Sequence, residues 1–441
     1  MTVIELLSHL DERGIRLWEE NDELRYSSPK GAMTAELKHA IRQRRKELID
    51  SLQAKKASAD LPPIPRVPTA DHYPLSNAQQ RVWILSQMED GSSAYTIPLH
   101  VLLEGELDIV FLEKAFQEVV DRHESLRTTF ATVDGEPRQI VRDPDVYHLS
   151  VLDLSDRKDP QTEARRIAVE EAAHVFDLEA GPLLRARVLR IEPLRHVLVC
   201  TMHHIVSDGV SIGVFFAEIA AAYNAQRRSE PMPLPELLIQ YRDYAVWQSE
   251  QLESSDAAAH RDYWRDKLGG ELPVLDLPTD AARPPVQTFR GREIVFPLGV
   301  ERSVGLRRLA RENQASLFMV LLTCLKTLLH RYTGAKDLIV GSPAAGRYHP
   351  DLQAQIGFYL NTLPLRTFPV GAMSFMDFLE QVRRTCLDAF EHQQYPFDRL
   401  VNDLRVERDL SRSPVFDIMM ILQNQDDAPP TFEGIRSGFF V

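Results

Sequence analysis

Four prolines within ten residues, in the stretch LPPIPRVPTA at positions 61–70, divide this chain into a short part and a long part. Proline fixes φ and lacks a backbone N–H, so such a stretch is expected to be extended. We therefore interpret residues 61–70 as a semi-rigid linker. At roughly 100–200 residues per domain, the full length of 441 residues predicts two to four compact units.

The composition is that of an ordinary folded protein, with 44% hydrophobic and 26% charged residues, and it excludes wholesale disorder, a collagen-like fibre and a coiled coil. A net charge of −13 argues against nucleic-acid binding, because phosphate binding needs a basic face. The N-terminus lacks a basic region followed by a long apolar core, and the apolar stretch 318–325 is too short to span a bilayer. We predict no nucleic-acid partner, no membrane partner and a cytoplasmic location.

The cysteines also indicate a reducing compartment. Cys200, Cys324 and Cys386 lie far apart, each in an apolar run and without a CxxC pair. Neither a disulfide framework nor a zinc ribbon is therefore expected.

The first 60 residues begin with the signals of a short helix followed by a hairpin. Thr2 and Glu5 have the spacing of a capping box. An apolar face and a glycine suited to end the helix follow: Leu6, Leu7, Leu10 and Gly14. Ile15 and Leu17 then alternate with Arg16 and Trp18, residues 24–26 alternate in the same way, and Asn21-Asp22 between them suits a tight turn.

A second helix is expected with Thr34 as its cap. Its apolar face comprises Leu37, Ile41, Leu48 and Leu52. Residues 33–58 hold seven basic and three acidic side chains, so this helix is basic. An αββα unit of this size is only marginally stable alone. It is either a structural extension or a surface that docks a peptide by strand addition.

The remainder, residues 71–441, has the pattern of a mixed α/β (α+β) fold. Helical stretches at 109–120 and 317–329 are each followed by an apolar strand, at 197–202 and 338–340. Turn signals such as Asp134-Gly135 separate the elements. We expect two similar halves.

The segment VLVCTMHHIVSDGVS, residues 197–211, holds the residues best suited to chemistry. Neighbouring strand residues point to opposite faces, so only one of His203 and His204 is expected to face a given cleft. An imidazole can accept a proton near neutral pH, as attack by an amine on an acyl group requires. Asp208 either accepts from the histidine or holds the loop through an arginine, and Gly209 is expected to permit an unusual backbone conformation.

Other interpretations of this segment are weaker but not all excluded. A histidine at a strand end is most often a packed core residue. A zinc site is disfavoured, because vicinal histidines converge poorly on one ion. The chain has no P-loop, which disfavours nucleotide chemistry.

The stretch MHHIVSDGVS, residues 202–211, resembles the HHxxxDG signature of nonribosomal peptide synthetase condensation domains. Six further stretches resemble the other core motifs of that family in chain order: LSNAQQRVW at 75–83, RHESLRTTF at 122–130, YRDYAVW at 241–247, IGFYLNTLPLR at 356–366, HQQYPFD at 392–398 and RDLSRSP at 408–414. Residues 1–55 resemble a second family, the TubC-type N-terminal docking domains, which favours the peptide-docking interpretation of residues 1–60.

The condensation-domain resemblance implies two chloramphenicol-acetyltransferase-like lobes in a V-shaped pseudo-dimer, at 71–248 and 249–441. It implies an amide bond formed between a donor acyl or peptidyl thioester and an acceptor aminoacyl thioester. Donor and acceptor carrier proteins present both on 4'-phosphopantetheine arms, so the chain binds no cofactor of its own. The docking domain implies a further partner, the C-terminal peptide of the upstream synthetase.

The resemblance also assigns roles to individual residues. His204 acts on the acceptor amine where the lobes meet, while His203 is packed as structure. Asp208 pairs with Arg347, and the Gly209 N–H is a candidate oxyanion donor. Asn361 lines the site.

Two departures from the family pattern stand out. Val210 stands where many relatives have Trp, and the chain ends at Val441, where relatives continue, so the second lobe is expected to be truncated. The alternatives to a condensing enzyme are an epimerisation domain of the same superfamily and a catalytically silent interaction domain.

Overall fold

The computed structural model describes the chain except for residues 1–5, 7–9, 11–12, 21–22, 30–31, 46–47, 50–60, 88–92, 289–290, 407–408, 424–428 and 441. The chain divides into two compact units. The smaller holds residues 1–63 and 347–353, and the larger holds 64–346 and 354–441. No helix among the described residues is long and apolar enough to cross a lipid bilayer.

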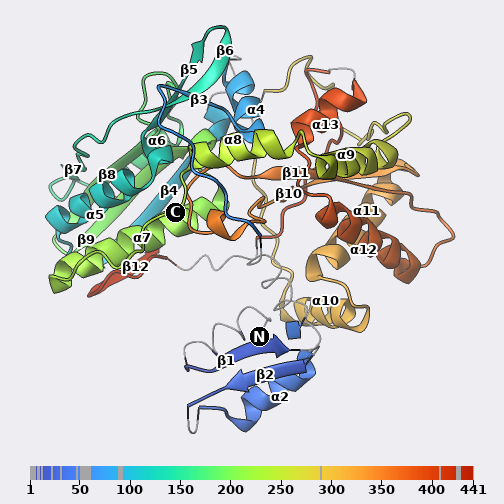
Figure 1. Cartoon of the computed structure of the whole chain (residues 1–441), viewed down its shortest axis with the longest axis horizontal. Coiled ribbons are helices and arrows are strands. Elements are labelled where there is room, and N and C mark those ends of the chain that lie inside the picture. The colour runs from blue at the N-terminus through green and yellow to red at the C-terminus, as the bar shows by residue number, and fades with distance from the viewer. Residues whose placement is uncertain are drawn as a thin grey trace. The chain divides into compact units, whose positions relative to one another are not determined.

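The smaller unit contains an antiparallel hairpin and a helix around a core of its own (Figure 1). Its elements are β1 (Arg16–Glu20), β2 (Glu23–Ser27) and α2 (Ala35–Gln43). The Thr34 side chain accepts from the N–H of Leu37 at 3.3 Å, which confirms the expected cap of α2. Gly14 has φ of +67°, the left-handed conformation expected of a glycine that ends a helix. The capping box at Thr2, the turn at Asn21-Asp22 and Leu52 lie outside the described residues.

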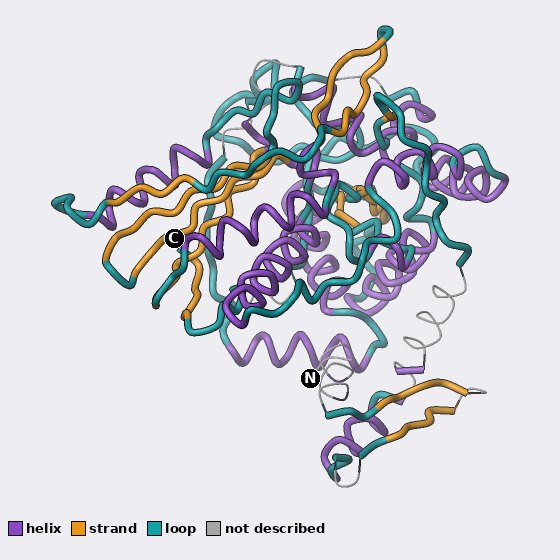
Figure 2. Tube along the Cα trace, turned by 60° about the vertical axis from the view of Figure 1, so that its left-hand side comes forward, coloured by secondary structure: helices purple, strands orange, loops and turns teal. Residues whose placement is uncertain are grey.

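The first half of the larger unit is built on a five-stranded sheet of order β12-β4-β9-β8-β7 (Figures 1 and 2). Its central strand β9 (Arg195–His203) is buried almost throughout, because α5 and α7 cover one face of the sheet and α6 the other. Leu198, Cys200 and Met202 therefore point into one core, and Val197 and Val199 into another. This explains why the strand is continuously apolar rather than alternating.

The other elements of this half have the following bounds: β4 Thr96–Gly105, β7 Ser150–Asp153, β8 Leu184–Glu192, α5 Ile109–Arg122, α6 Pro160–Ala172 and α7 Gly209–Arg228. Beside them lie α4 (Asn77–Ser86) and a three-stranded sheet of order β3-β6-β5, with bounds β3 Tyr73–Pro74, β5 Thr128–Val133 and β6 Glu136–Val141. The predicted helix at 109–120 and strand at 197–202 are confirmed.

The second half of the larger unit surrounds a separate core with helices and one hairpin, β10 (Leu338–Ala344) paired with β11 (Asn361–Thr367). The predicted helix at 317–329 and strand at 338–340 are confirmed. The expected similarity of the halves does not extend to their sheets, since this hairpin is the only named sheet of the second half among the described residues. Its helices are α9 Ser255–Lys267, α10 Val300–Glu312, α11 Leu317–Thr333, α12 Phe375–Glu391 and α13 Phe397–Leu404. Helix α8 (Tyr241–Gln251) contacts β3 and the 3₁₀ turn Glu124–Arg127, both in the first half.

Segments from the second half of the chain enter the first half. Strand β12 (Ile435–Phe439) comes from the end of the chain, yet it pairs antiparallel with β4 at the edge of the first sheet. Phe358 and Phe432 likewise belong to the first core. The boundary at 248/249 stays a prediction, and these segments cross it. The V-shaped arrangement of two lobes also stays a prediction.

The proline-rich stretch is attached to the larger unit rather than free of it. Ile64 is buried, and Arg66 donates to the carbonyl oxygen of Leu237 at 2.8 Å. The N–H of Val67 donates to the Asp243 carboxylate at 2.9 Å. Of this stretch, only the part before Ile64 is therefore outside the larger unit.

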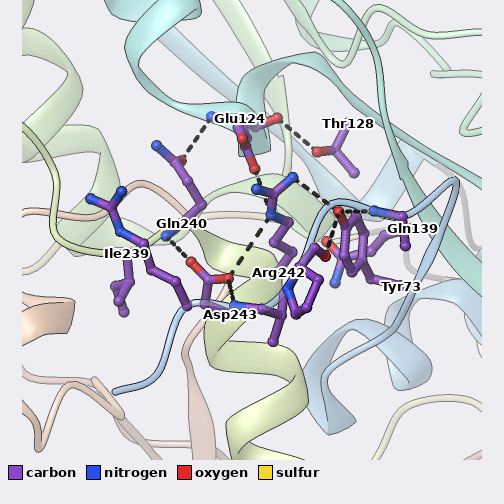
Figure 3. A network of polar contacts seen from close by, with 12 residues as sticks. Tyr73, Glu124, Thr128, Gln139, Ile239, Gln240, Arg242 and Asp243 are labelled. Carbon is purple, nitrogen blue, oxygen red and sulfur yellow. Dashed lines mark hydrogen bonds and ion pairs between the residues drawn. The ribbon is translucent and has the colours of Figure 1, made fainter. Parts of the chain in front are cut away.

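A polar network beside this attachment joins three stretches that are remote in sequence (Figure 3). Arg242 donates to the Tyr73 hydroxyl at 3.0 Å, lies over the Tyr73 ring and is 3.3 Å from a Glu124 carboxylate oxygen. The Gln240 side chain accepts from the N–H of Glu124 at 3.1 Å, and its backbone N–H donates to Asp243 at 2.7 Å. The motif stretches at 122–130 and 241–247 therefore hold each other in place.

Candidate functional site

The loop that carries the two histidines connects the buried strand β9 to helix α7. β9 ends at His203, a single 3₁₀ turn spans His204–Val206, and α7 begins at Gly209. Gln79 of α4 donates to the carbonyl oxygen of Ile205 at 3.1 Å, which fixes the 3₁₀ turn from outside the loop. The loop is therefore held by the strand, the helix and α4 together.

His203 is a core residue. Its ring is fully buried, and Nδ1 accepts from the N–H of Ile205 at 3.1 Å. The rings of Phe176 and Tyr95 lie beside it, with centroids 5.9 and 6.4 Å away. Burial, followed by the proximity of His204, lowers the pKa of His203 to about 3, so the ring is neutral in the folded protein.

His204 has a different environment, although it is the next residue. It is only partly buried, and Nδ1 lies 3.0 Å from the carbonyl oxygen of Ser207. A carbonyl only accepts, so Nδ1 carries the proton and Nε2 keeps a lone pair. Burial lowers the pKa of His204, and the Ser207 contact and Asp208 partly offset this. The neutral ring can therefore accept a proton through Nε2.

Asp208 is fully buried and caps helix α7. One carboxylate oxygen accepts from the N–H and the hydroxyl of Ser211, both at 2.8 Å. The other accepts from the N–H of Tyr359 at 3.0 Å. These contacts hold the loop through Ser211 and connect it to a segment about 150 residues later, while the pairing of Asp208 with an arginine stays a prediction.

Ser211 makes a second connection to that segment. Its hydroxyl lies 2.7 Å from the Gly357 carbonyl oxygen and accepts from the Gly357 N–H at 3.0 Å. The ring of Phe358 in turn meets the His204 ring edge-on, with centroids 5.5 Å apart. Ser211 and Asp208 thus place Phe358 against the candidate base.

Tyr241, at the start of α8, holds the same segment from the other side. Its hydroxyl donates to the carbonyl oxygen of Phe358 at 2.5 Å and lies 2.8 Å from the Ser76 hydroxyl. A Cβ on Gly357 would lie 2.0 Å from the Tyr241 ring, so only glycine fits there. The motif stretches at 202–211 and 241–247 therefore both hold residues 357–359, and Ser76 is joined to them through Tyr241.

The expectation that Gly209 permits an unusual backbone conformation is wrong. Its φ lies outside the left-handed region, and a Cβ built on it would meet no atom within 4 Å. Gly209 is exposed, and as the first residue of α7 its N–H belongs to the helix terminus, where N–H groups have no partner within the helix. The glycine therefore relieves neither backbone strain nor a steric clash.

Asn361 braces a loop. Its side-chain NH₂ donates to the carbonyl oxygens of Gln393 and Tyr395, both at 2.8 Å, and its oxygen accepts from the N–H of Phe397 at 2.9 Å. These contacts fix the stretch that leads into α13. Its proposed place in the lining of the site stays a prediction.

Arg347 is buried, and its Nη1 donates to the carbonyl oxygen of Leu352. Gln353 donates to the Arg347 carbonyl oxygen at 2.7 Å. These contacts lie within residues 347–353, which cluster with the smaller unit. The ion pair between Arg347 and Asp208 stays a prediction.

Three site-supporting residues were missing from the sequence-based assignments: Ser211, Gly357 and Gln79. Each lies inside one of the stretches that resemble family motifs, and this position is the sequence signal that could have identified it. Their roles depend on partners more than 120 residues away, which spacing does not reveal.

The comparisons with known proteins identify the family. The Condensation domain family matches residues 69–437, and the TubC N-terminal docking domain family matches residues 3–54. The chain therefore belongs to the condensation domain family and carries a docking domain in front. Both resemblances noted in the sequence are confirmed.

Curated relatives are components of peptide synthetases. Surfactin synthase subunit 1 of Bacillus subtilis (strain 168) is 44% identical over 360 residues, which is 82% of this chain and 10% of the relative. Tyrocidine synthase 3 of Brevibacillus parabrevis is 40% identical over 374 residues, or 85% of this chain and 6% of the relative. The chain thus spans a tenth or less of the length of these relatives.

Solved structures share the fold. The X-domain from teicoplanin biosynthesis is 27% identical, with a TM-score of 0.77 over 86% of this chain and 84% of that one. The condensation domain from the Monacolin K polyketide synthase MokA is 24% identical, with a TM-score of 0.75 over 85% of this chain and 86% of that one. The predicted α/β class is confirmed.

Proposed function

We propose that the chain forms an amide bond between two thioester substrates, and that His204 is the residue that acts on the acceptor amine. The observation that carries this proposal is the tautomer of His204. Its Nδ1–H is held by the Ser207 carbonyl, which leaves Nε2 free to accept a proton. The ring is neutral in the folded protein because burial lowers its pKa.

The reaction requires one bond to form and one to break. The acceptor nitrogen attacks the donor carbonyl carbon, the nitrogen loses a proton to His204 Nε2, and the donor thiolate leaves and takes up a proton. The Gly209 N–H at the start of α7 is the candidate donor to the developing oxyanion. Because both substrates arrive tethered, positioning supplies much of the rate advantage.

The partners in this proposal are donor and acceptor carrier proteins. Their 4'-phosphopantetheine arms carry both thioesters, so the chain itself needs no bound cofactor. The Asp208–Arg347 ion pair and a cytoplasmic location are part of the same proposal.

The test is an assay with loaded donor and acceptor carriers, in which intact thioesters are followed by mass spectrometry. The wild type should transfer the donor group to the acceptor arm, and His204→Ala should lower the rate by about 10²–10⁴-fold if it acts as general base. His148→Ala is the matched control, because His148 is exposed. Unchanged turnover in His204→Ala would rule out the base.

A second candidate function is partner binding without catalysis. It is favoured by the similarity to the teicoplanin X-domain, a domain also solved in a complex with OxyB. The carrier assay separates the two, since a silent domain yields no amide product from any pair of loaded carriers.

For the smaller unit we propose docking of the C-terminal peptide of an upstream synthetase by strand addition. The hairpin β1–β2 is a two-stranded sheet among the described residues, so its edges are open to a further strand. Trp18 and Tyr26 on it are exposed by 44% and 49%, which is unusual for side chains of this size.

Deletion of residues 1–60 should abolish capture of that peptide and leave condensation of directly supplied carriers unchanged. Added salt should weaken capture, because the second helix is basic and surface charges are screened. Peptide binding by fluorescence anisotropy measures both effects. Equal affinity before and after the deletion would contradict the docking role.

A further inference from the structure

The segment at residues 356–359 lies against the loop that follows β9, although it belongs to no helix or strand. Side chains from elsewhere in the chain bind its backbone instead. The Ser125 hydroxyl donates to the carbonyl oxygen of Ile356 at 2.7 Å, and the Ser211 hydroxyl contacts both backbone groups of Gly357. The position of this segment is therefore set by hydrogen bonds from particular side chains, and the loss of one such bond can shift it.

Tyr241 binds the residue whose ring contacts the candidate base. Its hydroxyl donates to the carbonyl oxygen of Phe358 at 2.5 Å. The Phe358 ring meets the His204 ring edge-on, with centroids 5.5 Å apart. Both Tyr241 and Phe358 are buried. A change at the Tyr241 hydroxyl therefore reaches His204 through one intervening residue.

The same hydroxyl joins helix α8 to the start of α4 (Figure 1). A tyrosine hydroxyl has one proton, and the carbonyl of Phe358 takes it, so the Ser76 hydroxyl is the donor in the 2.8 Å contact between the two hydroxyls. Ser76 caps α4 and accepts from the N–H of Gln79 at 3.2 Å. The Gln79 side chain donates to Ile205 in the 3₁₀ turn of the loop. One hydroxyl therefore links the two structures, segment 356–359 and α4, that hold this loop.

A general base needs a ring of fixed orientation. One hydrogen bond, from Nδ1 of His204 to the Ser207 carbonyl, does not by itself fix the tilt of the ring. The edge-on contact with Phe358 restricts that tilt and shields the ring from water. Burial lowers the pKa of His204, so displacement of Phe358 should raise that pKa toward its ordinary value. Orientation matters for the rate, because a misplacement of about 1 Å can cost about 10²-fold.

We propose that Tyr241 is a positioning residue of the condensation reaction, because its hydroxyl holds Phe358 against His204 and so fixes the direction of the free Nε2. The inference rests on the proposed role of His204. Tyr241 acts only through Phe358 and contacts neither substrate. Its ring is packed against Gly357, where an added Cβ would lie 2.0 Å from it, so the ring keeps its place when the hydroxyl alone is removed.

The test is Tyr241→Phe in the assay with loaded carriers. The variant should lower the transfer rate at saturating carriers by about 10-fold, the worth of one hydrogen bond. The carrier concentration that gives half-maximal rate should not change, because the base is altered and carrier binding is not. Tyr223→Phe is the matched control, since Tyr223 is also buried and its hydroxyl also binds a backbone group, the N–H of Asp108 at 3.1 Å. The control should keep the wild-type rate.

A double-mutant cycle with His204→Ala separates positioning from a purely structural effect. If Tyr241 acts through His204, Tyr241→Phe should lower the rate of the wild type and have no further effect in His204→Ala. The same fold loss in both backgrounds overturns the proposal, and so does an unchanged rate in Tyr241→Phe alone.

NMR of the His204 ring gives a readout that does not depend on turnover. Its signals should titrate at a higher pH in Tyr241→Phe than in the wild type or Tyr223→Phe, and an unchanged titration overturns the proposal. If His204→Ala leaves the rate unchanged, the proposed base fails, and the titration alone decides whether Tyr241 positions the ring. Thermal unfolding shows whether Tyr241→Phe folds. If it does not, Phe358→Leu tests the same contact and should show the same two effects.

Discussion

At the scale of the residue, two adjacent histidines show how environment separates side chains of identical chemistry. His203 accepts a backbone N–H inside the core, and burial lowers its pKa to about 3. His204 donates to the Ser207 carbonyl at the edge of the core and presents its other nitrogen. The protonation of the first is fixed by burial, and only the second is available for proton transfer.

Two glycines near this site should respond in opposite ways to an added methyl group. Gly357→Ala would force a Cβ into the Tyr241 ring and should lower the free energy of unfolding by about 2 kcal/mol or more. Gly209→Ala has free space and should change it by less than about 0.5 kcal/mol. Urea unfolding measures both. Equal losses would show that the packing around residue 357 is not as tight as the structure has it.

At the scale of the element, helix α11 is fastened to the hairpin β10–β11 by a buried lysine. The Lys326 ammonium donates to the carbonyl oxygens of Leu365 and Leu338 at 2.6 and 3.3 Å and to the Thr367 hydroxyl at 2.9 Å. It is fully buried, and burial lowers its pKa to about 7. One side chain therefore links the helix to both strands.

This lysine should make stability depend on pH. The unfolded chain keeps it protonated up to a pKa of about 10.4, whereas the folded chain loses the proton near 7, so between these values the unfolded state binds more protons. Rising pH therefore favours the folded state, by about 2 kcal/mol between pH 7 and pH 9.

Urea unfolding at the two pH values checks this. Lys326→Met should lose the rise with pH, whereas the control Lys336→Met, at an exposed lysine, should keep it. The same slope in wild type and Lys326→Met would exclude a titrating lysine in the core.

At the scale of the whole molecule, the larger unit is tied together by segments that cross between its halves. Residues 356–361 reach the loop of His204, and the chain end pairs with β4. Phe432 is buried in the first core, where its ring meets that of Tyr223 edge-on at 5.3 Å. The first core therefore depends on residues more than 200 positions away.

Phe432→Ala should consequently destabilise the larger unit by about 3–5 kcal/mol, the usual cost of removing a buried phenylalanine ring. Phe439→Ala is the control, since Phe439 is 57% exposed on the neighbouring strand. Urea unfolding measures both free energies. A small effect at position 432 would mean that the first core closes without the chain end.

Much of the fold could be predicted from local pattern. The strand ending at His203, the cap at Thr34 and the helices at 109 and 317 follow from periodicity and capping, because those signals depend on residues within a few positions. The proline-rich stretch was predicted to be a semi-rigid linker, and local pattern could not reveal its attachment through Arg66 and Val67, which depends on partners at 237 and 243.

The sequence by itself determined the family, the order of the two domains and the loop that holds His203, His204 and Asp208. Motif spacing and hydrophobic periodicity suffice for these, because both depend only on residues close together in the chain. Only the tertiary structure decided which histidine keeps a free nitrogen and that Ser211 and Gly357 hold Phe358 in place. It also showed that Gly209 has an ordinary backbone conformation with free space around it. The physical reason is that burial and hydrogen-bond geometry arise between residues that the chain separates by more than a hundred positions.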